Sequence, residues 1–351
     1  MSKIALRSFN PLLKDSFFLL PRFTHEKSQL KNAEECQNII NKLNLRDDYN
    51  SKKLNIIDVN PGFGLFSSML NYELKPKNHI LLDKHEENYK KWSKKIEHLQ
   101  TVNQNQENFK ILKHDPFIWD TYDKIFQNGI IEELKPQPYD KLNDELLIVA
   151  NWTGKGDESI IAQWIGCCGN RNWLMKYGKV RMLLMIPSTT AMKFLSEPGY
   201  KKRNRTSLKR DLYTHSKLIA IGDDSDILGK GYDPRVLVRD QPIVLKKNAF
   251  LRNSEVAIIE VFPGEYQTDC ISNIEHLLSA MFVSSTKLKD HLPKLAPGAE
   301  YLVSLLSDDI LEKRASEFTK QDILEFSNAY GQWPFKPSIE ETFDISEEDF
   351  A

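Results

Sequence analysis

The stretch Leu54-Asn55-Ile56-Ile57-Asp58-Val59-Asn60-Pro61-Gly62-Phe63-Gly64 decides the fold of this 351-residue chain. Its first half is an apolar run with the length and the branched residues of a buried strand, and its second half is a loop with two glycines. Glycine lets a backbone approach a nucleoside closely while the following helix begins. The stretch therefore predicts the first strand and the nucleoside-binding loop of an open α/β fold.

Acidic residues follow the next two predicted strands. Asp83 ends the run that begins at His79, about 20 residues after the glycine loop, where an acid accepts hydrogen bonds from ribose hydroxyls. Asp115 follows the strand predicted at 109–112, and the loop lacks the third glycine of dinucleotide-binding proteins. These features favour an S-adenosylmethionine-type cleft over a nicotinamide site, and a tight turn in a protein without a ligand is the alternative. The predicted cleft residues are Asp58, Gly62, Gly64, Asp83, Asp115 and Asn151.

Strands and helices continue to alternate on both sides of these motifs. A helix is predicted before the first strand, in residues 27–45, and another around residues 89–99. Apolar runs at 146–150, 180–187 and 256–261 predict further strands. This alternation predicts an α/β, doubly wound, Rossmann-like sheet that binds ligands at the carboxyl ends of its strands.

The pattern changes after Pro263 to helical runs at 271–282, 301–306 and 320–330. A proline-bracketed segment and an acidic tail follow, and proline with acidity predicts a tail that is extended or disordered when free. We expect three parts: a methyltransferase-like α/β domain in residues 1–263, a helical C-terminal domain in 264–332 and a flexible acidic tail in 333–351.

The net charge of −1 conceals an uneven distribution. From Pro337 onward there are six acidic residues and no basic ones, so residues 1–336 carry a net charge of about +5. Because the acidic tail offsets the mildly basic remainder of the chain, the overall net charge does not reveal an anion-binding surface. The sequence therefore leaves room for a nucleic-acid partner.

Composition also excludes several classes of protein. A hydrophobic content of 40% and a charged content of 28% are those of a soluble globular protein. No run of 18 apolar residues exists, so we expect no transmembrane helix. The cysteines and histidines lack the spacing of metal ligands, so no metal site is predicted, and a reducing compartment is favoured. No nucleophile accompanies His114 and Asp115, and no catalytic residue is predicted.

Aromatic residues lie close to the expected carboxyl end of the sheet. Phe117 and Trp119 are two apart in an extended segment, so they face the same way. Together with Trp152 on the next loop they could stack on unpaired bases. A hydrophobic plug over the sheet is the alternative.

A basic segment begins just after Pro198-Gly199. Residues 201–210 contain six basic residues and no acidic one, which predicts phosphate contacts and strongly salt-dependent binding. A solvated basic loop is the alternative. With the neighbouring lysines, the predicted contacts are Lys179, Lys193, Lys201, Lys202, Arg203, Arg205, Lys209 and Arg210.

The order of these motifs, from about residue 50 to 265, resembles the ribosomal RNA adenine dimethyltransferase superfamily. In its enzymes the loop after the fourth strand holds the target adenine with Asn, an aliphatic residue, Pro and an aromatic residue. This chain keeps Asn151, but Thr153 replaces the proline and Gly154 the aromatic residue. The enzymes' Gly-Gln-Asn/His-Phe cofactor motif has no counterpart around residues 14–18, and Asn60 replaces a loop glycine. The resemblance implies a methyltransferase fold with a degenerate catalytic motif, because positioning supplies much of such catalysis.

Four longer strings resemble the mitochondrial transcription factor B branch of that superfamily, known from yeast: residues 150–154, 173–180, 186–191 and 333–337. This resemblance implies a monomeric, non-enzymatic transcription initiation factor of the mitochondrial matrix. It implies that the factor joins a single-subunit, phage-like RNA polymerase, assists promoter melting and holds the non-template strand. The tail, residues 338–351, is then expected near the template strand, where it steers strands and does not bind phosphate.

Two other functions remain open on the sequence. One is an active S-adenosylmethionine-dependent ribosomal RNA adenine N6-dimethyltransferase, with Asn151 engaging the amine. The other is a polymerase- or ribosome-binding scaffold without nucleic-acid contact. The favoured interpretation requires no cofactor, leaves residual S-adenosylmethionine binding open, and includes no membrane partner.

Overall fold

The computed structural model describes residues 5–222, 231–265, 271–282 and 286–337. The chain divides into two compact units, residues 1–192 with 214–265 and residues 193–213 with 266–351. This division differs from the consecutive domains that the sequence indicates, because the segment 193–213 groups with the C-terminal helices.

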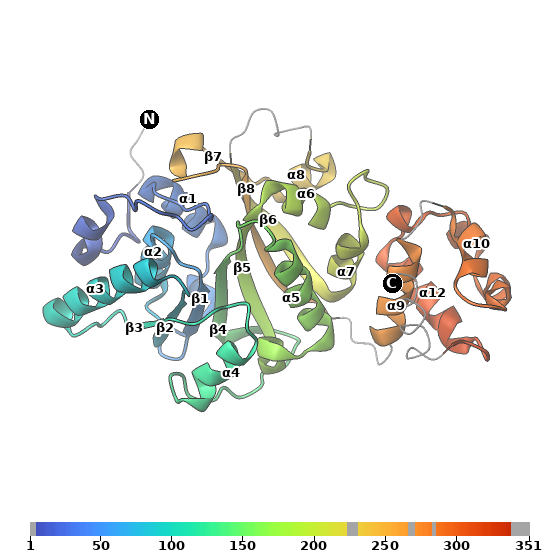
Figure 1. The fold of residues 1–351 in the computed structure, drawn as a ribbon, viewed down its shortest axis with the longest axis horizontal. Coiled ribbons are helices and arrows are strands. Elements are labelled where there is room, and N and C mark those ends of the chain that lie inside the picture. Colours follow the sequence, from blue (N-terminus) through green and yellow to red (C-terminus); the bar gives the residue numbers. More distant parts are fainter. Residues whose placement is uncertain (1–4, 223–230, 266–270, 283–285, 338–351) are drawn as a thin grey trace. The chain divides into compact units, whose positions relative to one another are not determined.

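In the part of the chain that the structure describes, the first unit contains an eight-stranded sheet in the order β3-β2-β1-β4-β5-β8-β6-β7 (Figure 1). Neighbouring strands run parallel except for β8, which is antiparallel to both β5 and β6. The predicted α/β sheet is thus confirmed, while β6 and β7 were not predicted. The strands are β1 (Asn55–Val59), β2 (Asn78–Leu82), β3 (Phe109–Leu112), β4 (Leu142–Asn151), β5 (Lys179–Pro187), β6 (Thr214–Gly222), β7 (Ile243–Leu245) and β8 (Val256–Pro263).

Apolar side chains on both faces of the sheet explain why its central strands lack a polar alternation. All five residues of β1 are buried, as expected of a strand covered on both faces. Ile56, Leu147 and Leu183 pack in one core cluster with the apolar sides of α1 (Ala33–Leu43) and α2 (Leu65–Leu74). Helix α5 (Glu158–Asn170) lies across the strands in Figure 1. This layering leaves the carboxyl ends of the strands to loops.

The helix before β1 is shorter than expected, and the difference matters for the site. Asn32 caps α1 by accepting hydrogen bonds from the N–H groups of Glu34 (2.9 Å) and Glu35 (3.1 Å). The cap makes the helix begin at residue 33, so residues 24–31 form a non-helical segment, which we call the N-terminal strap. The other helices of this unit are α3 (Glu86–Asn103), α4 (Asp120–Gln127) and α8 (Pro234–Asp240), and α6 (Ser188–Phe194) reaches the unit boundary.

The second unit is helical in its described residues. Its predicted runs correspond to α9 (Ile271–Met281), the 3-10 helix at Ala299–Leu305 and α12 (Lys320–Gln332). Thr319 and Asp322 form a capping box at the start of α12, and α12 contacts α7 (Arg205–Tyr213) and α9. The unit also contains the short helices α10 (Leu288–His291) and α11 (Asp308–Leu311) and the 3-10 helices Leu292–Lys294 and Ala315–Glu317. The acidic tail at 338–351 lies outside the described residues.

The described helices include none with the length and apolar character needed to cross a lipid bilayer. The described residues contain no group of three or more His, Cys, Asp or Glu side chains arranged to hold a metal ion. Cys36, Cys167 and Cys168 are buried free thiols, whereas Cys270 lies outside the described residues.

Candidate nucleotide cleft and nucleic-acid interface

The glycine loop after β1 adopts the conformation that the sequence predicts. Gly62 and Gly64 have φ angles of +54° and +81°, which favour glycine. A Cβ atom on Gly64 would lie 2.1 Å from the Trp92 ring, and one on Gly62 would lie 2.6 Å from the Gln29 side chain. The glycines are therefore required by close packing against this chain's own side chains.

Gln29 on the N-terminal strap occupies the inner side of that loop. Its Oε1 accepts a hydrogen bond of 2.6 Å from the N–H of Phe63, and its Nε2 donates to the Thr24 carbonyl at 3.3 Å. The residue is buried. Residues 14–18 contain no glutamine, and the glutamine that lies at the loop is Gln29. Its sequence signal is Ser28-Gln29 shortly before the helix cap Asn32.

The three predicted cofactor carboxylates all have protein partners. Asp58 is buried, and its Oδ2 lies 3.2 Å from His79 Nε2. Asp83 accepts hydrogen bonds from the His85 N–H (2.9 Å) and from Asn88 Nδ2 (2.8 Å), and burial raises its pKa. Asp115 pairs with Lys84 at 3.1 Å. Asp58 and Asp83 are thus enclosed, and only Asp115 keeps an exposed surface.

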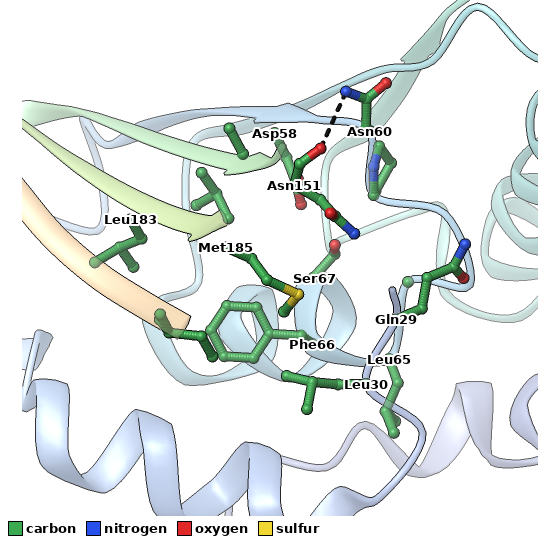
Figure 2. Close-up of a pocket in the computed structure, with 15 residues that line it drawn as sticks. Gln29, Leu30, Asp58, Asn60, Leu65, Phe66, Ser67, Asn151, Leu183 and Met185 are labelled. Atoms are coloured by element: carbon green, nitrogen blue, oxygen red, sulfur yellow. Dashed lines mark hydrogen bonds between the residues drawn. The ribbon is translucent and has the colours of Figure 1, made fainter. Parts of the chain in front are cut away.

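Asn151, the residue expected to engage an amine, is engaged by the strap instead. Its Nδ2 donates to the Ser28 carbonyl at 2.7 Å, and its Oδ1 accepts from the Thr153 hydroxyl at 2.7 Å. Thr153 Oγ1 also accepts from the Ser28 N–H at 2.8 Å. Asn60 Nδ2 donates to the Asn151 carbonyl at 3.3 Å (Figure 2). The side-chain oxygen and nitrogen of Asn151 are therefore both occupied within the chain.

Figure 2 shows the pocket beside Asn151, with Leu30, Leu65, Phe66 and Met185 around it. Its cavity volume is about 40 Å³. A ligand pocket usually measures about 300–1,000 Å³, so this space holds a few water molecules at most. No nucleoside fits here without rearrangement.

A larger cleft lies at the carboxyl ends of β1 to β4, with a volume of about 380 Å³. Asn60, Phe117 and Gly154 come from three of the loops at these strand ends, and the stacked rings of His25 and His85, 3.9 Å apart, also line it. Burial lowers the pKa of His85. The cleft is of nucleoside scale, but none of the six predicted cleft residues lines it. Its charged lining was not predicted: Glu26, Lys27, Lys84, Lys155 and Asp157.

The predicted aromatic residues divide into two groups. Phe117 and Trp119 are each 38% exposed, whereas Trp152 is fully buried. Trp152 therefore cannot stack on a base in this conformation, and its prediction as a contact is corrected. Its ring meets Phe117 edge-on at 4.9 Å, and Trp173 meets Trp119 edge-on at 5.5 Å. The buried Trp152 and the half-buried Trp173 hold the two exposed rings in place, as edge-to-face pairs do.

Several predicted phosphate contacts are buried and have structural roles. Arg203 donates to the carbonyls of Ser196 (2.7 Å) and Phe318 (2.8 Å) and pairs with Asp211 at 2.6 Å. Arg210 is likewise buried. A contact with phosphate needs a solvent-exposed donor, so the predictions of Arg203 and Arg210 as phosphate contacts are corrected. Two further residues are mostly enclosed: Lys179, beside the Phe262 ring, and Lys209, paired with Glu275.

The basic surface that remains in the second unit consists of Lys193, Lys201, Lys202 and Arg205. Lys201 and Arg205 are exposed, and Lys193 and Lys202 are half-buried. Burial, Lys201 and Lys193 lower the pKa of Lys202, so the three ammonium groups are close enough to repel one another. Arg205 contacts the Ser279 hydroxyl at 2.9 Å. We call these four residues the basic surface.

Comparison with known proteins identifies the family. A model described as ribosomal RNA adenine dimethylase matches residues 21–300. The chain belongs to this family. It is 32% identical over 324 residues to mitochondrial transcription factor 1 of Saccharomyces cerevisiae, which covers 91% of this chain and 92% of the relative. It is 27% identical over 320 residues to mitochondrial transcription factor 1 of Lachancea kluyveri, with 88% and 90% covered.

A solved member of the fold is similar over most of the chain. The crystal structure of a dimethyladenosine transferase from Plasmodium falciparum superposes with a TM-score of 0.56 at 15% identity and covers 87% of this chain and 98% of that one. At this identity the likeness establishes the fold. The family match and this neighbour thus agree on a methyltransferase-like fold for the chain.

Proposed function

We propose that this member of the rRNA adenine dimethylase family is a mitochondrial transcription initiation factor without methyltransferase activity. It joins a single-subunit RNA polymerase in the matrix, assists promoter melting and holds the separated non-template strand. The observation that carries the proposal is the engagement of Asn151 by Ser28 and Thr153. The relatives named mitochondrial transcription factor 1 support the assignment.

Loss of catalysis follows from the hydrogen bonds at Asn151. A target amine would need the Asn151 side-chain oxygen, which the Thr153 hydroxyl already occupies at 2.7 Å. Thr153 also lacks the pyrrolidine ring of a proline, and Gly154 provides no aromatic face. Transfer of a methyl group requires the reacting atoms to be held within about 3–3.5 Å in line, and this loop no longer holds an adenine.

Strand holding follows from the exposed rings and the basic surface. Phe117 and Trp119 present π-faces that stack on unpaired bases regardless of their identity. The 380 Å³ cleft, whose wall includes Phe117, is large enough for one base. Lys201, Lys202 and Arg205 supply phosphate contacts from the second unit. We propose that the acidic tail acts near the template strand and displaces or steers it.

Run-off transcription with the cognate polymerase tests the proposal. We expect initiation on a linear duplex promoter only when the protein is added, and a much weaker dependence on a template with a pre-melted bubble, because the bubble supplies the separated strands. Equal initiation with and without the protein on the linear promoter would remove the proposal.

An active adenine N6-dimethyltransferase is the second candidate, favoured by the family and by the 380 Å³ cleft at the carboxyl ends of the strands. Labelled S-adenosylmethionine and small-subunit ribosomal RNA test it. We expect no methyl transfer above background with the purified chain. Turnover that is lost in Asn151→Ala would establish the enzyme and would overturn our assignment.

A further inference from the structure

A second large pocket opens on the outer side of the glycine loop, with a volume of about 430 Å³. One wall is the N-terminal segment 16–22, another is Gly62 and Phe63 of the loop, and the third is helix α3. The pocket shares neither Asn151 nor the exposed rings with the site described above. Nothing in the proposed transcription role uses it.

The charges of this pocket are unbalanced. Arg22, Lys91 and Lys94 line it, and within the described residues no carboxylate lies at ion-pair distance from any of them. Glu87, the acidic residue of the lining, lies 3.6 Å from His25. Three cations without an ion-pair partner among the described residues, against one carboxylate, leave this concave site with a net positive charge, which attracts an anion because the pocket walls focus the field.

A fourth basic residue, Lys95, lines the buried wall of the pocket and also favours an anion there. Its Nζ donates to the Phe63 carbonyl at 2.7 Å and lies over the rings of Phe17, Phe63 and Trp92 at 4.8, 5.8 and 4.4 Å. Burial and the neighbouring charge of Lys91 lower the pKa of Lys95. An anion in the pocket would relieve this repulsion.

The rest of the wall is apolar and exposed. Leu19 and Leu20 line the pocket and are 85% and 52% exposed. Phe18 and Phe23 on the same segment are 66% and 52% exposed. Apolar side chains gathered at one place on a surface mark a binding region. The ligand therefore has an apolar or planar part beside its negative charge.

We propose that this pocket binds a phosphate group that carries an apolar or planar moiety, with the phosphate on Arg22, Lys91 and Lys94 and the moiety on Leu19 and Leu20. Phosphate suits ammonium and guanidinium donors through charge-assisted hydrogen bonds. Two sources share this chemistry, a free nucleotide and an anionic phospholipid head group. The site is independent of the proposed function.

Binding to the full-length protein tests the site with defined probes. ATP and inorganic pyrophosphate are titrated calorimetrically, and flotation measures binding to phosphatidylcholine vesicles with and without phosphatidylglycerol. We expect binding to ATP or to the phosphatidylglycerol vesicles, with Lys91→Gln/Lys94→Gln weakening it at least tenfold, since the variant removes two charge-assisted contacts. ATP binding without vesicle binding identifies the free nucleotide as the source, and the reverse identifies the lipid.

The matched control is Lys246→Gln/Lys247→Gln, which removes the same charge from two exposed lysines beside β7. The exposed Leu19→Ser tests the apolar wall without disturbing the core, and it should weaken binding of whichever source is identified. Equal loss in the two double variants would show a general charge effect and overturn the site, as would absence of binding to every probe. Run-off transcription with the same three variants separates this result from the proposed function, because none of them removes Trp119 or the basic surface.

Discussion

Replacing Trp119 with alanine removes an exposed ring and leaves the cleft and its loops in place. The ring is 38% exposed and rests edge-on against Trp173, so it has room to stack on one base. Stacking of one base contributes roughly 1–3 kcal/mol, and a middle value of about 2 kcal/mol corresponds to about a 30-fold loss of open promoter. Affinity for closed duplex should change little, because duplex binding depends on phosphate contacts.

The assay follows 2-aminopurine fluorescence in the melted part of a labelled promoter, and fluorescence anisotropy measures duplex affinity. Ile118→Ala is the matched control, since Ile118 is 55% exposed on the same loop and has no ring. Loss of the Trp119–Trp173 pair also costs about 0.5–1.5 kcal/mol of folding stability, so urea unfolding must show that the variant is folded at the assay temperature. A pre-melted bubble should partly rescue the variant. Equal losses in Ile118→Ala, or equal losses on duplex and open promoter, would refute the stacking argument.

Three further predictions concern the strap, the basic segment and the glycine loop. Gln29→Ala leaves the buried N–H of Phe63 without its 2.6 Å acceptor and should lower the free energy of unfolding by about 1–3 kcal/mol in urea, whereas an unchanged midpoint would show that the strap is not anchored there. Arg203→Gln should cost about 3–5 kcal/mol of stability, because it breaks a buried ion pair. Lys201→Gln should leave stability unchanged and reduce the salt dependence of DNA binding by about one counterion. The opposite pattern would contradict our division of the basic segment into buried and exposed residues. Burial lowers the pKa of Lys95 from 10.5 to about 7, so between these pH values the unfolded chain binds more protons at this residue and the free energy of unfolding rises with pH. Lys95→Met should flatten that rise, measured by urea unfolding at pH 7 and pH 9. An unaltered slope would argue against a buried amine.

The central fold was predictable because its signals are local. The apolar run at residues 146–150 of β4 is continuous and buried, and a buried parallel strand needs no polar alternation. The strands β6 and β7 escaped prediction for different reasons. β6 begins with Thr214-His215-Ser216-Lys217, which is polar, and β7 is only three residues long. Their pairing depends on β8 and on each other, which is tertiary information.

The candidate site was predictable in position and less so in detail. Asp58, Asp83 and Asp115 all lie at the ends of strands, as expected, because strand order alone puts them there. Whether such a carboxylate faces a ligand depends on partners far away in sequence. His79, Asn88 and Lys84 take these roles, and one sequence carries no sign of that pairing.

The basic segment shows the same limit with charges. A run of six basic residues in ten predicts a surface, but α7 begins at Arg205, so successive residues point in different directions around the helix. Arg203 and Arg210 turn inward to Asp211, and Lys201 remains outside. Charge alone therefore overestimates how many residues of such a segment meet phosphate.

In the function proposed above, Thr153 contributes both to the loss of methyl transfer and to the fixed position of the strap. Compared with a proline at this position, threonine lacks the pyrrolidine ring that would contact an adenine. In the structure the same replacement supplies an N–H and a hydroxyl that proline lacks: both donate to Asn151 Oδ1, at 3.3 and 2.7 Å, while Thr153 Oγ1 accepts from Ser28. A bound amine would have to displace two donors and the strap together. The change therefore favours a fixed loop over an open catalytic one, which suits a protein that presents neighbouring rings to a strand.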